Sequence, residues 1–346
     1  MTERMSSFLP PEWAPQSCVM LTWPRCDGDF ARHFEAVEHN FLAIAAAIAR
    51  YENLHVNVTT DVPGLTARLI SAGVPRERLR IYELPNDDVW ARDHGPLTVI
   101  RGGRLVHLDF GFNGWGGKFP AERDNLLTRR LAAAGAWDAP VETVDFVLEG
   151  GSIEVDGAGT LLTTERCLLA PTRNPGYDKA GVEAVLKERL GVSRVLWLRH
   201  GDLLGDDTDG HIDTIARYCD AGTIAYQACD DRADPHYAEL AAMAQELAAF
   251  RSAAGKPYRL VPLPLPAAVH DPDDGRRLPA GYANFLIVNG AVLVPVYGDP
   301  RHDPLALERL RPCFPGREVV PIECRALIQQ YGSLHCVTMQ IPAPPQ

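Results

Sequence analysis

The 346-residue sequence lacks the features of several classes of protein. No segment approaches the roughly 20 apolar residues that a membrane-spanning helix needs. Residues 1–11 contain no basic stretch followed by an apolar run, so we expect no secretory signal. Basic residues number 34 against 45 acidic ones, which argues against a nucleic-acid partner, because such a partner requires a basic face. We therefore expect a cytoplasmic protein without membrane or nucleic-acid partners.

The eight cysteines show no pattern of a metal site or of a disulfide framework. They include no C-x-x-C pair and no zinc-type spacing. In a chain without an export signal we expect reduced thiols, most of them buried as small apolar residues. Cys336 differs from the others by its neighbours, because it directly follows His335 and lies shortly after Gly332.

The order of predicted elements repeats along the chain. In each copy, two β-rich runs joined by a glycine turn precede a helical pattern and one more short strand. Asn289-Gly290 lies between two apolar runs, which is the strongest short-range signal for a β-hairpin. The four copies are predicted at 97–100, 105–110, 122–134 and 142–147; at 152–155, 160–163, 181–190 and 194–198; at 213–218, 223–227, 237–250 and 258–261; and at 283–288, 291–296, 305–310 and 318–321.

The two ends of the chain can supply a fifth copy. Predicted strands 335–341 and 17–22 lack hairpin partners and can pair with each other, while helix 34–49 and strand 54–59 complete the unit. Residues 62–82 remain as an extra helix and strand. Pairing the first and last strands closes a ring and removes exposed sheet edges.

We therefore predict an α/β fold, a five-bladed ββαβ propeller with pseudo-five-fold symmetry that the N- and C-terminal strands close. The alternative is an open α+β sheet with hairpins. The chain is expected to form a single catalytic domain, residues 1–346, with approximate units at 93–148, 149–210, 211–281, 282–331, and 332–346 together with 10–60.

Reactive residue types stand at the start of each predicted unit. The residues are Asp93, Glu149, His211, Asn284 and Cys336, separated by 56, 62, 73 and 52 positions. Equivalent positions of a cyclic repeat converge on its axis. We therefore predict one central pocket in which the aspartate, the glutamate, the histidine and the cysteine meet.

The residue types of this pocket suit nucleophilic catalysis on a cation. A thiol such as that of Cys336 is a strong nucleophile once deprotonated, and histidine is the usual proton shuttle. His211 and Asp213 are two positions apart, so on a strand they would face the same side. Carboxylates on that side would clamp a flat cation through paired, charge-assisted hydrogen bonds.

Each candidate also has a plainer interpretation. Asp93 could form a surface ion pair, Glu149 could belong to a turn, and a cysteine on an apolar strand is usually core. His211 and His335 with nearby carboxylates could ligate a transition metal instead. The acidic run 206–210 resembles a calcium loop, but an EF-hand requires a glutamate at its twelfth position, which is absent here.

Several motifs occur together and in order along most of the chain, from Leu9 to Pro342. They are Trp90-Ala91-Arg92-Asp93-His94-Gly95-Pro96, Asp109-Phe110-Gly111-Phe112-Asn113-Gly114-Trp115-Gly116-Gly117, Glu149-Gly150-Gly151-Ser152, Asp207-Thr208-Asp209-Gly210-His211-Ile212-Asp213 and Leu334-His335-Cys336. In these motifs the chain resembles the agmatine deiminase family, within the guanidine-modifying (pentein) superfamily that includes bacterial peptidylarginine deiminases and arginine deiminases.

The resemblance implies a five-bladed propeller and a hydrolase of putrescine and polyamine biosynthesis. The implied reaction converts agmatine to N-carbamoylputrescine and ammonia through an amidino-thioether on the enzyme. Cys336 is similar to the family's nucleophile, and His211 to its general acid and base. Glu149 resembles the carboxylate that partners this histidine.

The resemblance also implies the substrate contacts. Asp93 and Asp213 resemble the pair that binds the guanidinium nitrogens, and Trp90 resembles a wall along the alkyl chain. No metal or organic cofactor is implied, and the partner is a small cationic guanidine; a homodimer is a further expectation from the family. Additional candidates for the pocket are Asp207, Asn284 and Trp115.

Other reactions share these residue types. A free-arginine deiminase should offer a base to the substrate's α-carboxylate, for which Arg92, Arg173 and Arg25 are available. A peptidylarginine deiminase needs an open pocket, and an amidinotransferase would admit an amine in place of water. A metal-dependent hydrolase using both histidines and a non-catalytic ring that binds a polyamine are alternatives from other classes.

Overall fold

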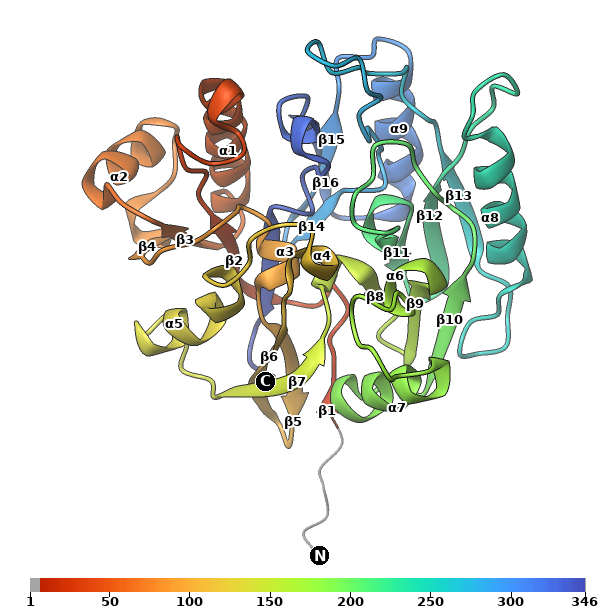
Figure 1. The fold of residues 1–346 in the computed structure, drawn as a ribbon, viewed down its shortest axis with the longest axis horizontal. Helices are drawn as coiled ribbons and strands as arrows, with labels where there is room; N and C mark the ends of the chain where they lie inside the picture. The colour runs from red at the N-terminus through yellow and green to blue at the C-terminus, as the bar shows by residue number, and fades with distance from the viewer. Residues whose placement is uncertain (1–6, 346) are drawn as a thin grey trace, which may run out of the picture.

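The computed structural model describes residues 7–345, so residues 1–6 and 346 of the predicted domain lie outside the described part. The fold is mixed α/β, as predicted. In the described part the strands form five separate sheets of four, three, three, three and four strands. Figure 1 shows these sheets around the short helices α3 (Ala91–His94) and α4 (Gly114–Gly117), with the longer helices on the outside.

Three of the sheets repeat one connection. In the clearest case β11 (Ala216–Asp220) pairs antiparallel with β12 (Thr223–Gln227), and the chain returns through α8 (Tyr237–Ala249) to β13 (Arg259–Leu263), parallel to β12. The predicted ββαβ order is therefore confirmed for these units. The other two are β8 (Ile153–Val155), β9 (Thr160–Thr164), α7 (Lys179–Leu190) and β10 (Arg194–Leu198), and β14 (Leu286–Val288), β15 (Ala291–Val296), α9 (His302–Leu310) and β16 (Glu318–Glu323).

The first sheet has the same order and one additional edge strand. It contains β5 (Leu97–Arg101), β6 (Arg104–Gly111) and β7 (Val141–Val147), and β1 (Ser7–Phe8) pairs antiparallel with β5. The helix between β6 and β7 is shorter than the predicted 122–134. A 3-10 turn, Asp124–Leu126, precedes α5 (Leu127–Ala133).

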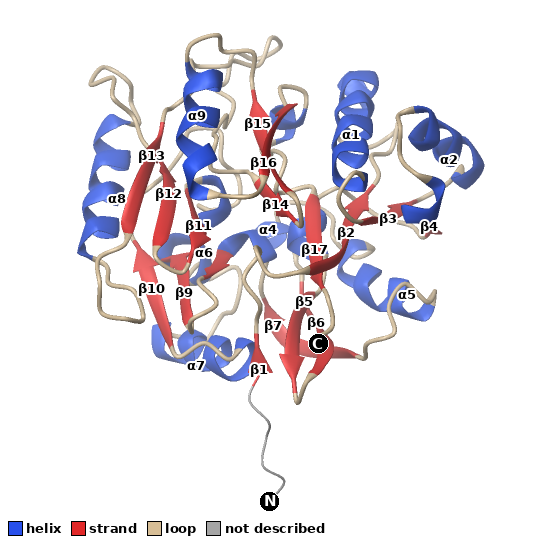
Figure 2. Ribbon diagram, turned by 180° about the vertical axis from the view of Figure 1, so that it is seen from behind, coloured by secondary structure: helices blue, strands red, loops and turns tan. Residues whose placement is uncertain are grey.

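The two ends of the chain share the remaining sheet. Strand β17 (Thr338–Pro342) pairs antiparallel with β2 (Gln16–Thr22), as predicted, and Figure 2 shows the two strands side by side. The sheet continues through β3 (Asn53–Val58) and β4 (Leu79–Glu83), both parallel to β2. Its helices are α1 (Phe34–Ala49) and α2 (Val62–Ser71).

Two predicted strands begin later than expected, and this changes the setting of the site. Residues 212–214 form a 3-10 turn before β11, and His335 and Cys336 lie in a turn before β17. In the first turn the backbone N–H and the hydroxyl of Thr214 both donate to the His211 carbonyl, at 3.3 and 2.9 Å. Thr338 donates in the same way to the His335 carbonyl, at 3.0 and 2.9 Å. The prediction that His211 and Asp213 share one face of a strand is therefore wrong.

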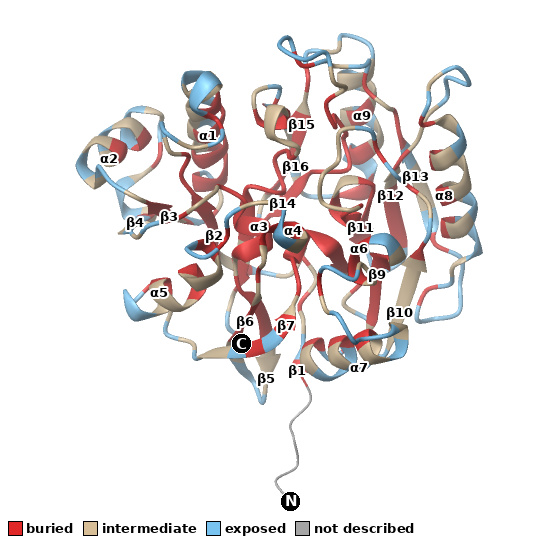
Figure 3. Ribbon diagram, viewed as in Figure 1, coloured by how far each residue is buried: buried red, intermediate tan, exposed pale blue. Residues whose placement is uncertain are grey.

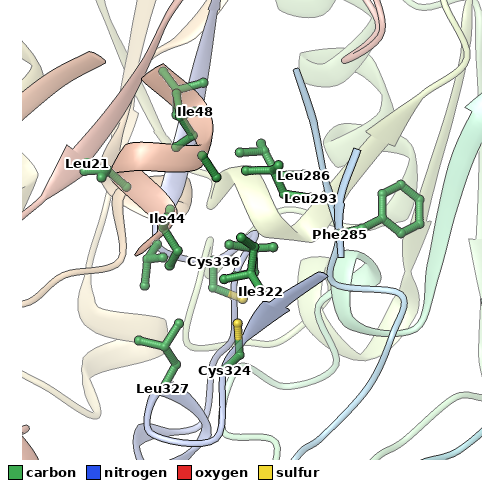
Figure 4. Close-up of a cluster of buried hydrophobic side chains, with 14 of the residues drawn as sticks. Leu21, Ile44, Ile48, Phe285, Leu286, Leu293, Ile322, Cys324, Leu327 and Cys336 are labelled. Atoms are coloured by element: carbon green, nitrogen blue, oxygen red, sulfur yellow. The ribbon is translucent and has the colours of Figure 1, made fainter. Parts of the chain in front are cut away.

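Buried residues concentrate in the strands and on the inner faces of the helices, while the outer faces of the helices are exposed (Figure 3). The largest apolar cluster lies between α1 and the sheet of β14–β16, and it includes Cys336 (Figure 4). The site is thus built directly on the core. Within the described residues, no helix has both the length and the apolar character needed to cross a membrane.

A test of this core is the substitution Ile44→Ala in α1. Ile44 is fully buried in the cluster, so we expect the free energy of unfolding to fall by about 2–5 kcal/mol, because the lost contacts leave a cavity. Urea denaturation followed by circular dichroism measures the change. Ile70→Ala in α2 is the matched control, since Ile70 is 45% exposed, and we expect it to change stability by less than about 0.5 kcal/mol.

Candidate active site

The turn before β17 presents the Cys336 thiol to a pocket. Asn284, just before β14, holds this turn, because its side-chain oxygen accepts from the backbone N–H of His335 at 2.8 Å and of Cys336 at 3.4 Å. The Asn284 amide also donates to the Cys336 sulfur at 3.3 Å. The Cys336 side chain is 4% exposed, and it borders the pocket. Asn284, an additional candidate from the sequence, is therefore in direct contact with the thiol.

Two buried carboxylates lie beside this thiol. Asp213 Oδ2 is 3.7 Å from the Cys336 sulfur and 2.7 Å from Nδ1 of His335, whereas Asp213 Oδ1 is buried and has no hydrogen-bond partner within the described chain. Asp93 accepts from Nε1 of Trp115 and from the backbone N–H of Gly151, both at 3.0 Å. Each carboxylate is thus held from behind by protein donors.

His211 lies beside Asp93, with its Nδ1 at 3.6 Å from Asp93 Oδ1. A ring nitrogen of His211 and an oxygen of Glu149 lie within 4.8 Å of each other. The carboxylate of Glu149 is held by Nε of Arg173 at 2.6 Å, and its Oε2 has no partner among the residues described. Arg173 therefore balances the charge of the buried Glu149 and leaves its second oxygen available.

Gly151 marks the point at which these groups meet. A Cβ at this position would lie 2.6 Å from Nδ1 of His211, 2.9 Å from Oδ1 of Asp93 and 3.1 Å from Oδ2 of Asp213. The three side chains, Asp93 from one unit and His211 and Asp213 from another, therefore surround one small space. That space is kept open because residue 151 has no side chain.

The pocket above these groups has about 400 Å³ of space, part of it open to solvent. Aromatic rings and carboxylates form most of its wall: Asp29, Asp88, Trp90, Asp93, Trp115, Phe119, Asp207 and Tyr331. The Trp90 indole is held by a hydrogen bond to Asp88 at 2.9 Å. It also packs against Gly332, where any Cβ would lie 2.2 Å from the ring. Trp90, Trp115 and Asp207 thus border the same pocket as Asp93 and Cys336, whereas Glu149, His211, Asp213 and Asn284 lie outside its lining.

Burial and charge set the protonation of the site. Burial and then the carboxylates of Asp213 and Asp93 raise the pKa of the Cys336 thiol well above its ordinary value. Burial also raises the pKa of Asp93, to about 6. For Asp213 burial acts in the same direction, but the hydrogen bond and charge of His335 outweigh it, and the pKa is lowered. Asp213 is therefore the more firmly ionised of the two carboxylates.

The metal hypothesis requires His211 and His335 to bind one ion together with nearby carboxylates, and the structure does not bring these two histidines into one group. Two groups of buried ligand-type atoms occur in the described chain, Glu149–Cys167–His211 and Glu12–Glu154–His335. His211 and His335 thus fall in different groups. The guanidinium of Arg217 already lies between the carboxylates of Glu12 and Glu154 in the second group.

Sequence reasoning missed the buried charges that support the site. Glu12 contacts His335, and Arg173 contacts Glu149. Glu12 stands in the Leu9–Trp13 segment, whose position beside the site only the fold reveals. All eight cysteines, each within the described residues, are free thiols, as expected.

The chain was compared with known proteins. Residues 8–342 match the family described as Porphyromonas-type peptidyl-arginine deiminase. The agmatine deiminase of Stutzerimonas stutzeri (strain A1501) is 38% identical over an alignment of 359 positions, gaps included. The alignment covers 97% of this chain and 96% of that relative. Two solved structures share the fold. A proposed arginine deiminase from Porphyromonas gingivalis has a TM-score of 0.91 and 51% identity, covering 98% of this chain and 99% of that one.

The second structure is a cysteine-to-serine variant of C. jejuni agmatine deiminase with substrate bound. It has a TM-score of 0.92 and 31% identity, covering 100% of this chain and 99% of that one. The chain therefore belongs to the guanidine-modifying superfamily and, within it, to the Porphyromonas-type peptidyl-arginine deiminase family. The resemblance inferred from the motifs is confirmed.

The electrostatic origin of the raised thiol pKa can be tested by alkylation. In Asp213→Asn one of the two negative charges beside the thiol is lost, so we expect the pKa of Cys336 to fall and its reaction with iodoacetamide at pH 7 to become several-fold faster. Peptide mass spectrometry distinguishes Cys336 from the other cysteines. Asp220→Asn, at the exposed end of β11, is the control. An unchanged or slower reaction in Asp213→Asn would contradict this explanation.

Proposed function

We propose that this chain catalyses the hydrolysis of agmatine to N-carbamoylputrescine and ammonia. The observation that carries the proposal is a thiol at the base of a pocket whose charged lining residues are all aspartates. The agmatine deiminases among the curated relatives, at 38% identity over nearly the full chain, support the same conclusion.

The charge of the pocket distinguishes between guanidine substrates. Among the described residues that line the pocket there is no lysine or arginine. Four of the lining residues are aspartates: Asp29, Asp88, Asp93 and Asp207. Agmatine carries a cation at each end, so the guanidinium can lie near Asp93 while the ammonium lies among the outer carboxylates. Free arginine has a carboxylate near its far end, which these aspartates would repel.

The three arginines considered for an α-carboxylate are engaged elsewhere. Arg92 is buried and lies 3.8 Å from Glu12. Arg173 donates to Glu149 and Asp209, both at 2.6 Å, and Arg25 pairs with Asp27. None of the three borders the pocket, which supports a substrate without an α-carboxylate.

In the first half of the proposed reaction, the two carboxylates orient the planar guanidinium over Cys336. The free Oδ1 of Asp213 is available for one substrate N–H group, and Asp93 lies beside His211 for another. The Cys336 thiol gives its proton to His211 as the sulfur attacks the guanidinium carbon and forms a C–S bond. The C–N bond then breaks, and His211 supplies the proton with which the nitrogen leaves as ammonia.

In the second half, water takes the place of the ammonia. His211, oriented by Glu149, removes a proton from this water as it attacks the amidino carbon. The C–S bond breaks, the sulfur leaves as thiolate and regains a proton from His211, and the hydroxyl on the carbon loses its proton to solvent to become the ureido carbonyl of N-carbamoylputrescine. Each residue has thus returned to its starting state apart from protons exchanged with solvent.

The substrate itself promotes formation of the nucleophile. Without a ligand, burial and then the charges of Asp213 and Asp93 oppose ionisation of the thiol and raise the pKa of Cys336. A guanidinium between them neutralises this charge and adds a positive charge next to the sulfur, so the pKa of the thiol falls when the substrate binds. The thiolate therefore forms mainly in the complex.

The arrangement of the units is part of the proposal. We infer that the five sheets act as five blades about the axis on which Asp93, Glu149, His211 and Cys336 converge. Pairing of β17 with β2 supports this closure. The unit boundaries given above, a cytoplasmic location and a homodimer stay predictions of this proposal.

A panel of guanidines tests the function. We expect ammonia and a ureido product from agmatine and little from arginine or arginyl peptides, measured by enzymatic ammonia determination and mass spectrometry. Cys336→Ala should lower the rate by a factor on the order of 10⁴ or more. Cys324→Ala is the matched control, because this buried thiol points toward Cys336 (Figure 4) but does not border the pocket, and it should retain most of the turnover.

Each alternative has its own result in this panel. Release of ammonia from arginine or from peptides at a higher rate than from agmatine would assign a different substrate. Transfer to an added amine would indicate an amidinotransferase. Loss of activity with a chelator and its return with added metal would indicate a metal-dependent hydrolase, and agmatine binding without ammonia release would indicate a binding ring.

Gly151→Ala tests whether the space between the three groups is needed. The added methyl group would overlap His211 and press on Asp93 and Asp213, so we expect kcat/KM for agmatine to fall by about 100-fold. Gly222→Ala is the control, since its Cβ would meet only a side-chain oxygen at 3.6 Å. Equal activity of the two variants would contradict the proposed role of this space.

A further inference from the structure

A continuous set of buried contacts connects Asp213 to the N-terminal segment of the chain. Nδ1 of His335 lies 2.7 Å from Oδ2 of Asp213, and Nε2 of the same ring lies 2.7 Å from Oε2 of Glu12. The three side chains are at most 8% exposed. The ring of His335 therefore stands between two carboxylates, one of which belongs to the site.

Glu12 is held rigidly in this position. Its Oε1 accepts from the backbone N–H of Ile287 at 2.7 Å, and its Oε2 accepts from Nη2 of Arg217 at 2.7 Å. Burial alone would raise the pKa of Glu12, but the charges of Arg217 and His335 outweigh it and keep the pKa well below its ordinary value. Glu12 is thus an ionised carboxylate with fixed partners on β14 and β11.

The contacts constrain how Asp213 is used. Both short contacts of His335 are hydrogen bonds only when Glu12, His335 and Asp213 together hold two protons. Burial and the charges of Arg217 and Arg92 lower the pKa of His335 and oppose the second proton, while the two carboxylates favour it. With Oδ2 of Asp213 bound to the ring, the carboxylate cannot rotate freely, and its Oδ1 has no partner in the part of the chain that the structure describes. The free oxygen is the one available to a substrate N–H group.

We propose that Glu12 is a positioning residue which, through His335, holds Asp213 with one oxygen free for the guanidinium of the substrate. This inference rests on the proposed function and adds a residue that lies outside the pocket. It also gives His335 a role distinct from that of His211: His335 orients a carboxylate, while His211 exchanges protons with the reacting groups.

A purely structural role is the competing explanation, because Glu12 also neutralises Arg217. Such a role predicts a loss of stability and an unchanged affinity for agmatine. A positioning role predicts a loss of affinity that depends on His335. Affinity, turnover and stability are therefore measured separately on the same variants.

The test uses Glu12→Gln in the full chain. One of the two carboxylate oxygens becomes an N–H donor and meets either Arg217 or the backbone N–H of Ile287, so the contact with His335 is disturbed. We expect KM for agmatine to rise by about tenfold while kcat changes much less, because a contact made in both ground state and transition state is weakened. In a Cys336→Ala background, calorimetry should show an equal rise in Kd for agmatine.

Substitutions of His335 separate its two contacts. In His335→Asn the amide can replace ring Nδ1 and keep the contact with Asp213, whereas in His335→Gln it can replace Nε2 and keep only the contact with Glu12. We expect His335→Gln to raise KM at least as much as Glu12→Gln. The double variant Glu12→Gln/His335→Asn should bind agmatine no more weakly than His335→Asn alone, because Glu12 acts only through the ring.

Glu52→Gln is the matched control. Glu52 is buried and accepts from the backbone N–H of Asn289 on the same hairpin, and burial raises its pKa to about 8, so the substitution removes no charge at pH 7. The inference would be overturned if the KM of Glu12→Gln for agmatine were within twofold of that of the unmodified protein. It would also be overturned if the effects of the two substitutions on agmatine binding added up in the double variant. If Glu12→Gln does not fold, a normal KM in His335→Gln has the same meaning.

The two proposals fail in different ways. Absence of ammonia release by the unmodified protein removes the proposed reaction, while the calorimetric comparison still measures the effect of Glu12 on agmatine binding. If the unmodified protein turns over agmatine and Glu12→Gln has the same KM and Kd, only the proposed role of Glu12 is removed. Absence of both turnover and agmatine binding overturns both.

Discussion

Two buried carboxylates, Asp93 and Asp213, act on the buried thiol of Cys336 and on each other, and a cation bound beside them would relieve their repulsion. The protein maintains this arrangement by holding each carboxylate from behind, through Trp115 and Gly151 for Asp93 and through His335 for Asp213. Burial, and after it these two charges, keep the pKa of Cys336 high in the free protein. The carboxylates that would attract a cation are therefore also among the causes of the raised thiol pKa.

The fold brings these groups together through a repeated turn. Ser152, Thr214 and Thr338 each donate from the backbone and from the hydroxyl to the carbonyl three residues earlier. Those carbonyls belong to Glu149, His211 and His335. The position equivalent to His211 is thus His335 rather than Cys336, and one turn geometry recurs at Glu149, His211 and His335.

The charge of the pocket bears on which guanidine substrate a member of this family takes. The descriptions of the relatives name different substrates. The matching family is named for peptidyl-arginine, one solved relative is a proposed arginine deiminase, and the curated relative reported above is an agmatine deiminase. Of the aspartates around the outer pocket, Asp207 is paired with Lys118 and burial raises the pKa of Asp88 to about 7, and together with Asp29 they support a substrate with a second cation.

The sequence by itself determined the repeated ββαβ order, the pairing of the chain ends and the residue types of the site, because hydrophobic periodicity, glycine turns and motif order are local properties. Only the tertiary structure decided that His211 and Cys336 lie in turns rather than strands, and that Glu12 reaches Asp213 through His335. The turns depend on Thr214 and Thr338 bonding to carbonyls three residues earlier, which hydrophobic periodicity does not reveal. The contacts of His335 join residues more than 100 positions apart, which no local pattern encodes.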